Sequence, residues 1–393
     1  MAEGIKDKVA IIGMGCTKFG ELWDKSGPDL IIDAYLECMQ DAGIEMKDLD
    51  AAWYSTLYPM QGLSGIQLAQ TLHLPYLPVT HVENLCASGT EAIRGAAYAL
   101  ASGAIDVALC VGMEKLKDVG YGGLPDMRPP HEQYWAPNAS GPGVYAMMAT
   151  RYFSVYGLSP EEGKKMLARV SWKSHQNGSK HPKAHLKKAI ELDAIINAPI
   201  IAWPLGLFDC CGVSDGAAAA VLVRTADAKK FRKDPVLIKG CTIAAASGED
   251  MWYTDYDYAH AETGFRAGQR VYKEAGIKNP REEISLAEVH DCFSITEAVT
   301  MEDLQFSPRG KVKEDIESGF FDLTGGLPVQ PDGGLKCFGH PIGASGLRML
   351  YECYKQLQGK AGDRQIKNPK LALTHNMGGY PPWSVVGVAI VGN

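Results

Sequence analysis

The sequence lacks the long apolar segments and the paired cysteines that would place it outside the cytoplasm. No apolar run reaches the roughly 18 residues that a helix needs to span a membrane, and charged residues at positions 3 to 8 argue against a signal peptide. The ten cysteines are scattered and include no C-x-x-C pair. In a chain of 393 residues this pattern predicts reduced thiols and not a disulfide framework. We therefore expect a cytoplasmic protein without a membrane span.

Two further absences exclude common binding functions. Positive charge is scarce: Asp and Glu outnumber Lys and Arg by 46 to 39, and the formal net charge is −7. This balance argues against broad nucleic-acid binding, so we expect no nucleic-acid partner. Residues 13–15 read Gly-Met-Gly after an apolar segment, but Lys18 stands where a dinucleotide-binding fingerprint needs its third glycine. That motif is therefore absent.

What the sequence does contain is a repeated order of strands and helices. Apolar patterning predicts a strand, a helix ending in Ala-Gly-Ile, a second strand, a helix opened by Ala-Ser-Gly and a last strand, twice over. The first set lies at 9–13, 28–42, 51–55, 90–102 and 107–111, and the second at 236–240, 266–275, 286–289, 347–358 and 371–374. With 393 residues, the chain is also too long for a single hydrophobic core of ordinary size. We predict an α/β fold made of two duplicated halves, 1–234 and 235–393.

The alternation of strands and helices predicts how the sheets are built and where a site lies. Strands joined through helices form mostly parallel sheets with helices on their faces. In such sheets, sites form where the strands end and their turns converge. Residues 115–207 differ from the rest of the chain in composition and pattern. Proline and glycine cluster at 120–143, helical patterns follow at 147–156 and 160–176, and a basic segment lies at 180–188. We interpret 115–207 as an inserted loop domain that covers the site.

Cys86 is the leading candidate for a nucleophile. It stands in a small-residue turn, Cys-Ala-Ser-Gly, immediately before the helix at 90–102. Backbone N–H groups point outward at a helix N-terminus, and the helix dipole is positive there. Such a position lowers the pKa of a thiol and favours the reactive thiolate. We therefore predict a thiolate at Cys86.

Three further turns supply groups that suit a thiol nucleophile. His290 and Cys292 follow the strand at 286–289, His340 precedes the helix at 347–358, and a polar, glycine-rich turn at 375–379 follows the last strand. A histidine beside a thiol takes its proton, and a second thiol can exchange a proton with carbon. Imidazole and backbone N–H groups can hold a thioester oxygen as it gains charge.

These four motifs, in this order, resemble the thiolase superfamily over essentially the whole chain. The turns at 86–89, 339–343 and 375–379 carry the general resemblance. The His-Asp-Cys-Phe turn at 290–293 and the His-Asn-x-Gly turn at 375–378 resemble the sterol-carrier-protein-type and archaeal-type thiolases in particular. The resemblance implies a thiolase fold with five αβαβα layers, built from two duplicated halves with a loop domain inserted in the first.

The resemblance also implies roles for individual residues. Cys86 matches the cysteine that accepts the acyl group, and His340 the histidine that deprotonates it and helps to form an oxyanion hole. His290 replaces the asparagine of the family's Asn-Glu-Ala-Phe turn and would take its oxyanion role. The family's terminal Cys-x-Gly turn has His375 or Asn376 instead of cysteine here, so Cys292 is the expected acid/base. Backbone N–H groups of Cys86 and Gly378 would form the second oxyanion hole.

The implied activity is thiolytic cleavage of a 3-oxoacyl-CoA, or the reverse Claisen condensation, with coenzyme A as co-substrate and no metal in this chain. The residues that bind coenzyme A stay unassigned. One alternative is a decarboxylating ketoacyl synthase, which lacks the second cysteine, so Cys292 discriminates. Another is a non-catalytic scaffold that binds acyl-CoA. The acyl group is left open between acetoacetyl-CoA, a medium or branched chain and an aromatic group such as benzoylsuccinyl-CoA.

The resemblance further implies a homodimer or dimer of dimers, and a small OB-fold partner protein that carries a zinc ribbon. The basic segment at 180–188 could meet that partner or the phosphates of coenzyme A. His181 and His185 have a metal-like spacing, but Pro182 and the surrounding lysines favour a solvated loop. The aromatic run at 252–258 favours loop packing over a substrate box.

Overall fold

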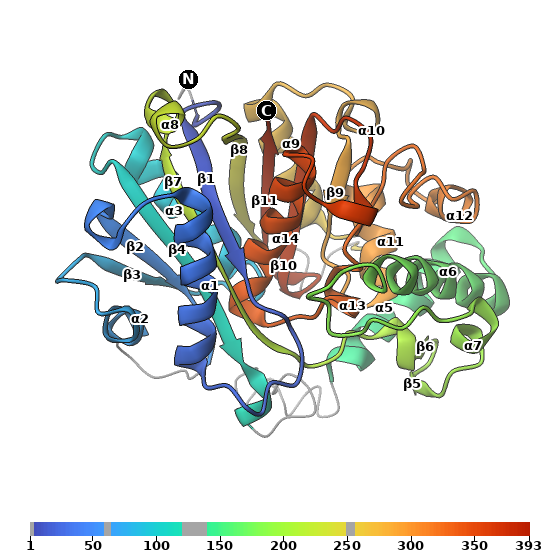
Figure 1. Cartoon of the computed structure of the whole chain (residues 1–393). Coiled ribbons are helices and arrows are strands. Elements are labelled where there is room, and N and C mark those ends of the chain that lie inside the picture. The colour runs from blue at the N-terminus through green and yellow to red at the C-terminus, as the bar shows by residue number, and fades with distance from the viewer. Residues whose placement is uncertain (1–3, 59–63, 120–139, 249–255) are drawn as a thin grey trace.

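The computed structural model describes residues 4–58, 64–119, 140–248 and 256–393. Figure 1 shows two sets of strands with helices between and around them. The strands are β1 (Val9–Cys16), β2 (Ala51–Ser55), β3 (Val79–Val82), β4 (Val107–Lys115), β5 (Ile200–Ala202), β6 (Leu205–Gly206), β7 (Asp215–Arg224), β8 (Val236–Ala245), β9 (Leu286–Glu288), β10 (Leu371–Tyr380) and β11 (Trp383–Gly392). The helices are α1 (Gly27–Ala42), α2 (Ser64–Leu72), α3 (Ser88–Ala101), α5 (Gly141–Tyr156), α6 (Pro160–Gly178), α7 (Leu192–Ile196), α8 (Thr225–Phe231), α9 (Glu262–Ala275), α10 (Pro280–Glu283), α11 (Ser294–Asp303), α12 (Val312–Glu317), α13 (Gly334–Cys337) and α14 (Ile342–Leu357).

The predicted helices and strands of both halves are present, and their local sequence explains their limits. A capping box between Ser26 and Asp29 opens α1, and the helix ends at Gly43, whose φ of 69° is left-handed. Helix α9, its counterpart, ends in the same way at Gly276, with φ 78°. The same cap at the same place in each half supports the duplication. The predicted boundary at 234/235 falls between α8 and β8 and stays a prediction.

The sheet is mixed, so the prediction of mostly parallel sheets is wrong. Nine strands run in the order β3-β2-β4-β7-β1-β8-β11-β10-β9. Of the pairs described, β2–β3, β2–β4 and β9–β10 are parallel, and the long central pairs are antiparallel. The reason lies in the connections: β10 and β11 form a hairpin, and the long insertion between β4 and β7 lets β7 return in the opposite direction.

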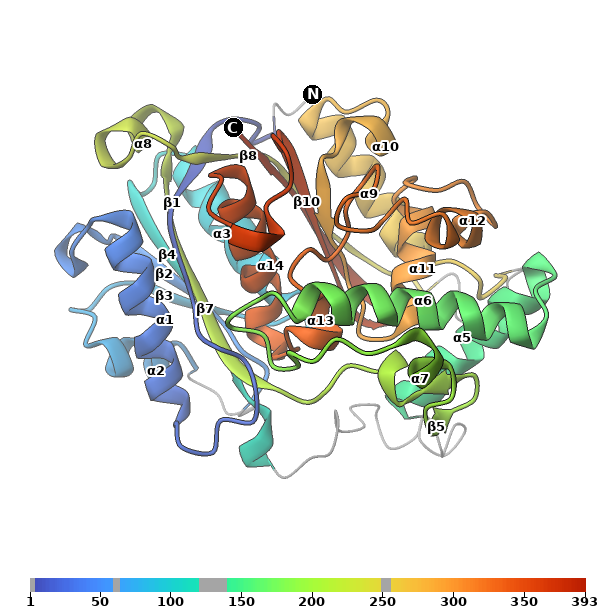
Figure 2. The same cartoon turned by 45° about the vertical axis from the view of Figure 1, so that its right-hand side comes forward.

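The five expected layers are visible in how the apolar side chains group. Helices α3 and α14 lie between the two halves of the sheet and share one core with both (Figure 2). Helices α1 and α2 cover the outer face of the first half. Helices α9 and α11 cover that of the second, together with α5 and α6 of the insertion. This arrangement confirms the predicted fold and puts the starts of α3 and α14 at its centre.

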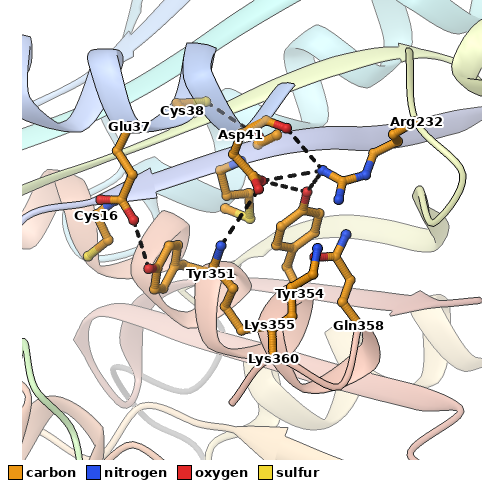
Figure 3. A network of polar contacts seen from close by, with 12 residues as sticks. Cys16, Glu37, Cys38, Asp41, Arg232, Tyr351, Tyr354, Lys355, Gln358 and Lys360 are labelled. Atoms are coloured by element: carbon orange, nitrogen blue, oxygen red, sulfur yellow. Dashed lines mark hydrogen bonds and ion pairs between the residues drawn. The ribbon is translucent and has the colours of Figure 1, made fainter. Parts of the chain in front are cut away.

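The two halves of the sheet join over a short distance only. Strand β1 pairs with β8 through Ala10 and Ile11 alone, so the rest of its edge lacks a strand partner. Backbone N–H and C=O groups along that edge form hydrogen bonds with side chains instead (Figure 3). Asp41 accepts from the Met14 N–H at 3.1 Å, and Arg232 donates to the Ile12 carbonyl at 2.6 Å. The polar groups that complete this edge, directly or through one another, are Glu37, Asp41, Lys183, Arg232, Tyr351 and Tyr354.

Some sequence predictions fall at the limits of the described residues. Of the aromatic run at 252–258, residues 252–255 lie outside them, while Tyr256 and Tyr258 pack against each other with ring centroids 4.6 Å apart. Most of the proline- and glycine-rich part of the insertion, 120–139, also lies outside. Within the described ranges, none of the helices has the length and apolar character needed to cross a bilayer.

Candidate active site

Cys86 and His340 meet at the centre of the molecule, although 254 residues separate them. The Sγ atom of Cys86 lies 3.2 Å from Nε2 of His340. Both side chains are buried, with 6% and 4% of their surface exposed. A thiol and an imidazole at this distance can share one proton. The structure thus brings together the two residues that the motifs predicted to act as a pair.

The pair forms because the starts of α3 and α14 touch through glycines. A Cβ atom on Gly89 would lie 3.0 Å from the backbone nitrogen of Leu347, and one on Gly346 would lie 2.7 Å from that of Thr90. Only glycine permits such an approach of two backbones. Both glycines belong to the repeated Ala-Ser-Gly turns. The two glycines of the repeat therefore set the distance between the turns that carry Cys86 and His340.

Ser345 determines which nitrogen of His340 carries the proton. Its Oγ lies 2.7 Å from Nδ1 of His340 and also donates to the Pro341 carbonyl at 2.8 Å. Since the hydroxyl has a single proton and gives it to Pro341, Nδ1 of His340 must be the donor to Ser345. The lone pair of His340 is then on Nε2, facing Cys86. Burial, followed by the charge of Arg348, lowers the pKa of His340 to about 3, so the ring is a neutral base.

A buried carboxyl group, Glu114, holds the first turn of α14 in place. It accepts from the backbone N–H groups of Gly343 at 2.8 Å and Tyr58 at 2.6 Å, and from the Thr56 hydroxyl at 3.1 Å. Burial raises its pKa to about 7, although these hydrogen bonds act in the other direction. Sequence reasoning missed Glu114, because its partners are backbone groups from remote segments. The only signal is a charged residue near the end of an otherwise apolar strand.

The prediction of a thiolate at Cys86 is wrong for the resting protein. Burial raises the pKa of this thiol to about 12, and the nearby Glu114 carboxyl adds to the effect. One backbone hydrogen bond lowers the pKa but does not offset burial. The positive electrostatic potential at the helix N-terminus is therefore too weak to ionise a thiol that is shielded from water. The pair rests as a neutral thiol beside a neutral imidazole.

His290 completes a cluster around the sulfur. Its ring centroid lies 5.2 Å from that of His340, nearly perpendicular to it. Burial, followed by the proximity of His340 and His375, lowers the pKa of His290 well below its usual value. Its Nδ1 atom is buried and finds no hydrogen-bond partner in the part of the chain that the structure describes. Among the described residues, one donor atom each of Cys86, His290 and His340 lies within 4.8 Å of the other two, close enough to hold a metal ion.

Cys292 lies beside this cluster and is also a neutral thiol. Burial raises its pKa well above the usual value, and the neighbouring Cys211 and Cys86 add to this effect. Its Sγ atom lies 3.8 Å from Thr296 Oγ1. Tyr145 of α5 donates its hydroxyl proton to the Gly379 carbonyl at 2.8 Å and stacks on Phe293 with ring centroids 4.7 Å apart. Sequence reasoning missed Tyr145 because it lies in the insertion, far from every motif.

The predicted glycine-rich turn at 375–379 is part of strand β10, which is a correction. Residues 371–380 pair continuously with β11. Asn376 is consequently fixed in the central layer: its Oδ1 accepts from the Thr90 hydroxyl at 2.9 Å, and its Nδ2 lies 3.1 Å from the Met349 sulfur. His375, on the opposite face, accepts from the His290 N–H at 3.4 Å.

Gly378 lies directly against the Cys86 turn. A Cβ atom there would come within 2.5 Å of the Asn84 carbonyl oxygen and 3.1 Å of the Cys86 nitrogen. The backbones of β10 and the cysteine turn therefore touch at this point, as the predicted oxyanion hole requires. The structure thus gathers Cys86, His340, His290, Cys292 and Gly378, and it holds the Asn376 amide between Thr90 and Met349. The catalytic role of Asn376 stays a prediction.

The basic segment at 180–188 is not the solvated loop that its composition predicts. His181 is buried, 3.6 Å from Glu352, and Lys183 binds Glu37 at 2.6 Å. His185 Nδ1 lies 3.1 Å from the Ser214 hydroxyl. The two histidines therefore have different partners and do not act as a metal pair. Lys180, Lys187 and Lys188 remain exposed.

This fold, with a buried cysteine beside a histidine where its two central helices begin, is that of the thiolase-type acyltransferases. The chain belongs to the thiolase family. The family model described as "Thiolase, N-terminal domain" matches residues 9–226, and "Thiolase C-terminal domain-like" matches residues 246–393. The resemblance predicted from the motifs is confirmed, and the chain is an acyltransferase of this family.

Similar proteins cover nearly the whole chain. The acetyl-CoA acetyltransferase of Methanothermobacter thermautotrophicus is 38% identical over 377 residues, which span 94% of this chain and 96% of that protein. The benzoylsuccinyl-CoA thiolase subunit BbsB of Thauera aromatica is 29% identical over 388 residues, spanning 95% and 96%. The solved structure of the Ltp2-ChsH2(DUF35) aldolase has a TM-score of 0.85 and 26% identity, with 99% of this chain and 98% of that chain covered.

Proposed function

We propose that this acyltransferase cleaves a 3-oxoacyl-CoA with free coenzyme A, or forms it in the reverse Claisen condensation, through an acyl group carried on Cys86. The observation that carries the proposal is the 3.2 Å distance between the Cys86 sulfur and a His340 nitrogen whose lone pair faces it. That geometry suits a base that removes the thiol proton as the sulfur attacks.

In the first half of the reaction, the Cys86 proton passes to Nε2 of His340 and the sulfur bonds to the ketone carbon, C3. The bond between C2 and C3 then breaks, C3 remains on Cys86 as a thioester, and C2 leaves with the electron pair. Cys292 protonates C2, and the shorter acyl-CoA departs. A thiol whose pKa is raised by burial is protonated at neutral pH, which suits a proton donor.

In the second half, the thiolate of Cys292 takes the proton of incoming coenzyme A, whose sulfur attacks the thioester carbon. The acyl group leaves on coenzyme A, and His340 returns its proton to Cys86. Two oxyanion holes assist: imidazole N–H of His290 and His340 on one side, backbone N–H of Cys86 and Gly378 on the other. Each such donor is typically worth about 3–4 kcal/mol.

The experiment is a panel of 3-oxoacyl-CoA esters assayed with coenzyme A, beginning with acetoacetyl-CoA. Cys86→Ser is expected to lower kcat by roughly a thousandfold or more, and Cys292→Ser by roughly a hundredfold. Cys292→Ser should still become acylated at Cys86 by acetyl-CoA, as measured by the mass of the cysteine peptide, because that step makes no carbon–carbon bond. Unchanged cleavage in Cys292→Ser would instead remove Cys292 from the mechanism.

Two controls separate other reactions. Cleavage of a 3-hydroxyacyl-CoA without coenzyme A would point to a retro-aldol reaction, in keeping with the name of the similar Ltp2-ChsH2(DUF35) aldolase. If no ester is turned over and Cys86 is never acylated, the thiolase proposal fails and the acyl-CoA-binding scaffold gains support. The identity to acetyl-CoA acetyltransferases, 38% and 36%, favours acetoacetyl-CoA over aromatic substrates.

We also propose that the chain works with a small OB-fold protein. The support is that one similar protein is named a subunit and that a similar structure is a complex with a DUF35 protein. The exposed Lys180, Lys187 and Lys188 offer a docking surface for that partner or for the phosphates of coenzyme A. Co-purification with and without reversal of these three charges tests the surface. Sedimentation of the purified chain tests the predicted dimer or dimer of dimers.

A further inference from the structure

We propose that Cys86, His290 and His340 also form a binding site for a soft divalent cation such as Zn²⁺, which holds the protein in an inactive form by occupying the nucleophile. Metal binding itself is independent of the acyl-CoA reaction, whereas the inactive form rests on the proposed role of Cys86 as nucleophile. It rests on the spacing of the three donor atoms, on the protonation state that Ser345 imposes, and on an unpartnered nitrogen of His290.

The spacing fits a tetrahedral ion. Bonds of about 2.3 Å to sulfur and about 2.0–2.1 Å to nitrogen place sulfur and nitrogen ligands roughly 3.5 Å apart, and two nitrogen ligands roughly 3.4 Å apart. The observed distance between Cys86 Sγ and His340 Nε2 is 3.2 Å. All three donor atoms lie within 4.8 Å of one another. Small side-chain rotations therefore suffice to surround an ion with three ligands.

The protonation state of His340 also suits a metal ligand. A ligating imidazole offers the lone pair of one nitrogen, and the proton on its other nitrogen is usually held by a hydrogen bond. His340 is prepared in this way, with Nδ1 donating to Ser345 and Nε2 facing Cys86. This matches a metal-binding histidine as closely as it matches a general base.

His290 supplies an independent observation. It is 1% exposed, and its buried Nδ1 has no hydrogen-bond partner among the described residues. Leaving such a nitrogen without a partner costs free energy that a ligand could recover. An imidazole nitrogen without a hydrogen-bond partner is the kind of ligand that a soft cation binds.

Two charged groups near the cluster have opposite effects on a bound cation. Glu114 is close enough to influence Cys86 and favours a cation, whereas Arg348 influences both histidines and opposes one. Binding replaces the S–H bond of Cys86 by a bond from sulfur to the metal and releases that proton to solvent. The two imidazoles lose no proton. The balance is one proton released for each ion bound, and the fourth ligand position stays open to water.

The first test measures binding directly, with Co²⁺ as a spectroscopic probe of the chelator-treated full chain. The expected result is a single ion per chain, a near-ultraviolet charge-transfer band from thiolate to Co²⁺, release of a single proton, and displacement by Zn²⁺. Cys86→Ser should lose the band, and His290→Gln should weaken binding by about tenfold or more. His260→Gln is the matched control, because His260 lies between Asp257 and Glu262, away from the cluster, and should retain the band.

The second test uses the unmodified protein, so it does not depend on whether a variant folds. Zn²⁺ should slow the alkylation of Cys86 by iodoacetamide by about tenfold or more, and a chelator should restore the rate. Cys210 and Cys211, which are only partly buried, serve as internal controls whose alkylation rates should not change. Equal slowing of all three thiols, no slowing of Cys86, or a band that persists in Cys86→Ser and disappears in His260→Gln would overturn the proposal. None of these outcomes depends on whether the protein is a thiolase.

Discussion

The Cys86 thiol and the His340 imidazole are both neutral at rest, and this determines how the pair can react. Burial raises the pKa of the thiol to about 12 and lowers that of the imidazole to about 3. A standing thiolate–imidazolium pair is then unfavourable. Proton transfer must accompany the attack of sulfur on the substrate, when the bound acyl group can stabilise the charge that forms.

The pH dependence of alkylation tests this state. The pKa of Cys86 is raised, so the thiolate fraction is small at neutral pH and grows about tenfold per pH unit until the pKa is reached. The alkylation rate of Cys86 by iodoacetamide should therefore rise continuously from pH 7 to beyond pH 9. Quantitative peptide mass mapping measures it. A plateau beginning near pH 7 would show a standing thiolate and contradict the neutral pair.

Ser345 is a positioning residue, and its removal should change reactivity more than stability. Ser345→Ala leaves Nδ1 of His340 without its acceptor, so the proton can move to Nε2 and block the transfer from Cys86. We expect kcat to fall by about tenfold with little change in KM, and Cys86 alkylation to slow at neutral pH. Ser102→Ala is the matched control, since the exposed Ser102 also donates to a helix carbonyl. If the role of Ser345 were purely structural, Ser345→Ala would lower the unfolding midpoint and leave the alkylation rate of the folded protein unchanged.

The contrast between predicted and missed residues has a physical reason. Cys86, His290, Cys292 and His340 could be identified from the sequence because each lies in a short motif next to the end of a strand or the start of a helix. Glu114 could not, because its burial depends on N–H groups contributed by segments 57 and 229 residues away. The raised pKa of Cys86 could not be predicted either, since burial is a property of the assembled layers.

Among the elements, α3 and α14 have matching starts that hold the site together. Ala-Ser-Gly covers the N-cap and the first two residues of α3, and the third to fifth residues of α14. In each case the serine hydroxyl donates to an earlier carbonyl: Ser88 to Leu85 at 2.5 Å, and Ser345 to Pro341 at 2.8 Å. The two serines therefore make a similar hydrogen bond near both helix starts. One start presents a thiol, and the other an imidazole.

Gly346→Ala tests the contact between these helices. The new Cβ atom would lie 2.7 Å from the Thr90 nitrogen and 3.1 Å from Asn376 Oδ1. We expect overpacking to lower the free energy of unfolding by about 1–3 kcal/mol and to reduce activity by moving His340 away from Cys86. Gly264→Ala in α9 is the matched control, because its Cβ would meet no neighbour nearer than 3.6 Å. If both variants had the same stability and activity as the wild type, the close approach would not matter.

Strand β10 shows where local sequence misleads. The polar and glycine-rich residues 375–379 have the composition of a turn, yet each pairs with β11. The partner strand supplies the hydrogen bonds that a turn would otherwise make internally. Asn376 is tolerated in the central layer because Thr90 and Met349 engage both ends of its amide. These compensating contacts are remote in sequence, which is why the pattern indicated a turn.

For the whole molecule, the repeated order of elements was enough to predict two halves and a central site, but not the direction of the strands. The periodicity of apolar residues predicts which faces of a helix or strand are buried. It does not predict whether a strand runs parallel or antiparallel to its neighbour. The same limit applies to the segment 180–188, whose charge suggested exposure. It instead joins the insertion to α14, through His181 and Glu352, and to the free edge of β1, through Lys183.

The link between the insertion and α14 depends on the charge of Glu352, so its contribution to stability should depend on pH. Glu352 is fully buried and accepts from Arg364 and Gln356, each at 2.9 Å. Burial alone would raise its pKa, but the hydrogen bond with His181 and the charge of Arg364 outweigh burial and hold the pKa below the ordinary value of 4.5. The folded protein therefore favours the ionised carboxylate.

Because the folded pKa is depressed, the stabilisation is present above pH 4.5 and is lost as the pH falls towards the folded pKa. Glu352→Gln should lower the free energy of unfolding by about 3 kcal/mol at pH 7, and the gap from the wild type should narrow steadily below pH 4.5. Urea unfolding from pH 7 to pH 3 measures this gap, with the exposed Glu317→Gln as the control that shows little effect at any pH. A gap of constant size would mean that Glu352 stabilises through its shape and not its charge, and that the insertion is joined to α14 by packing alone.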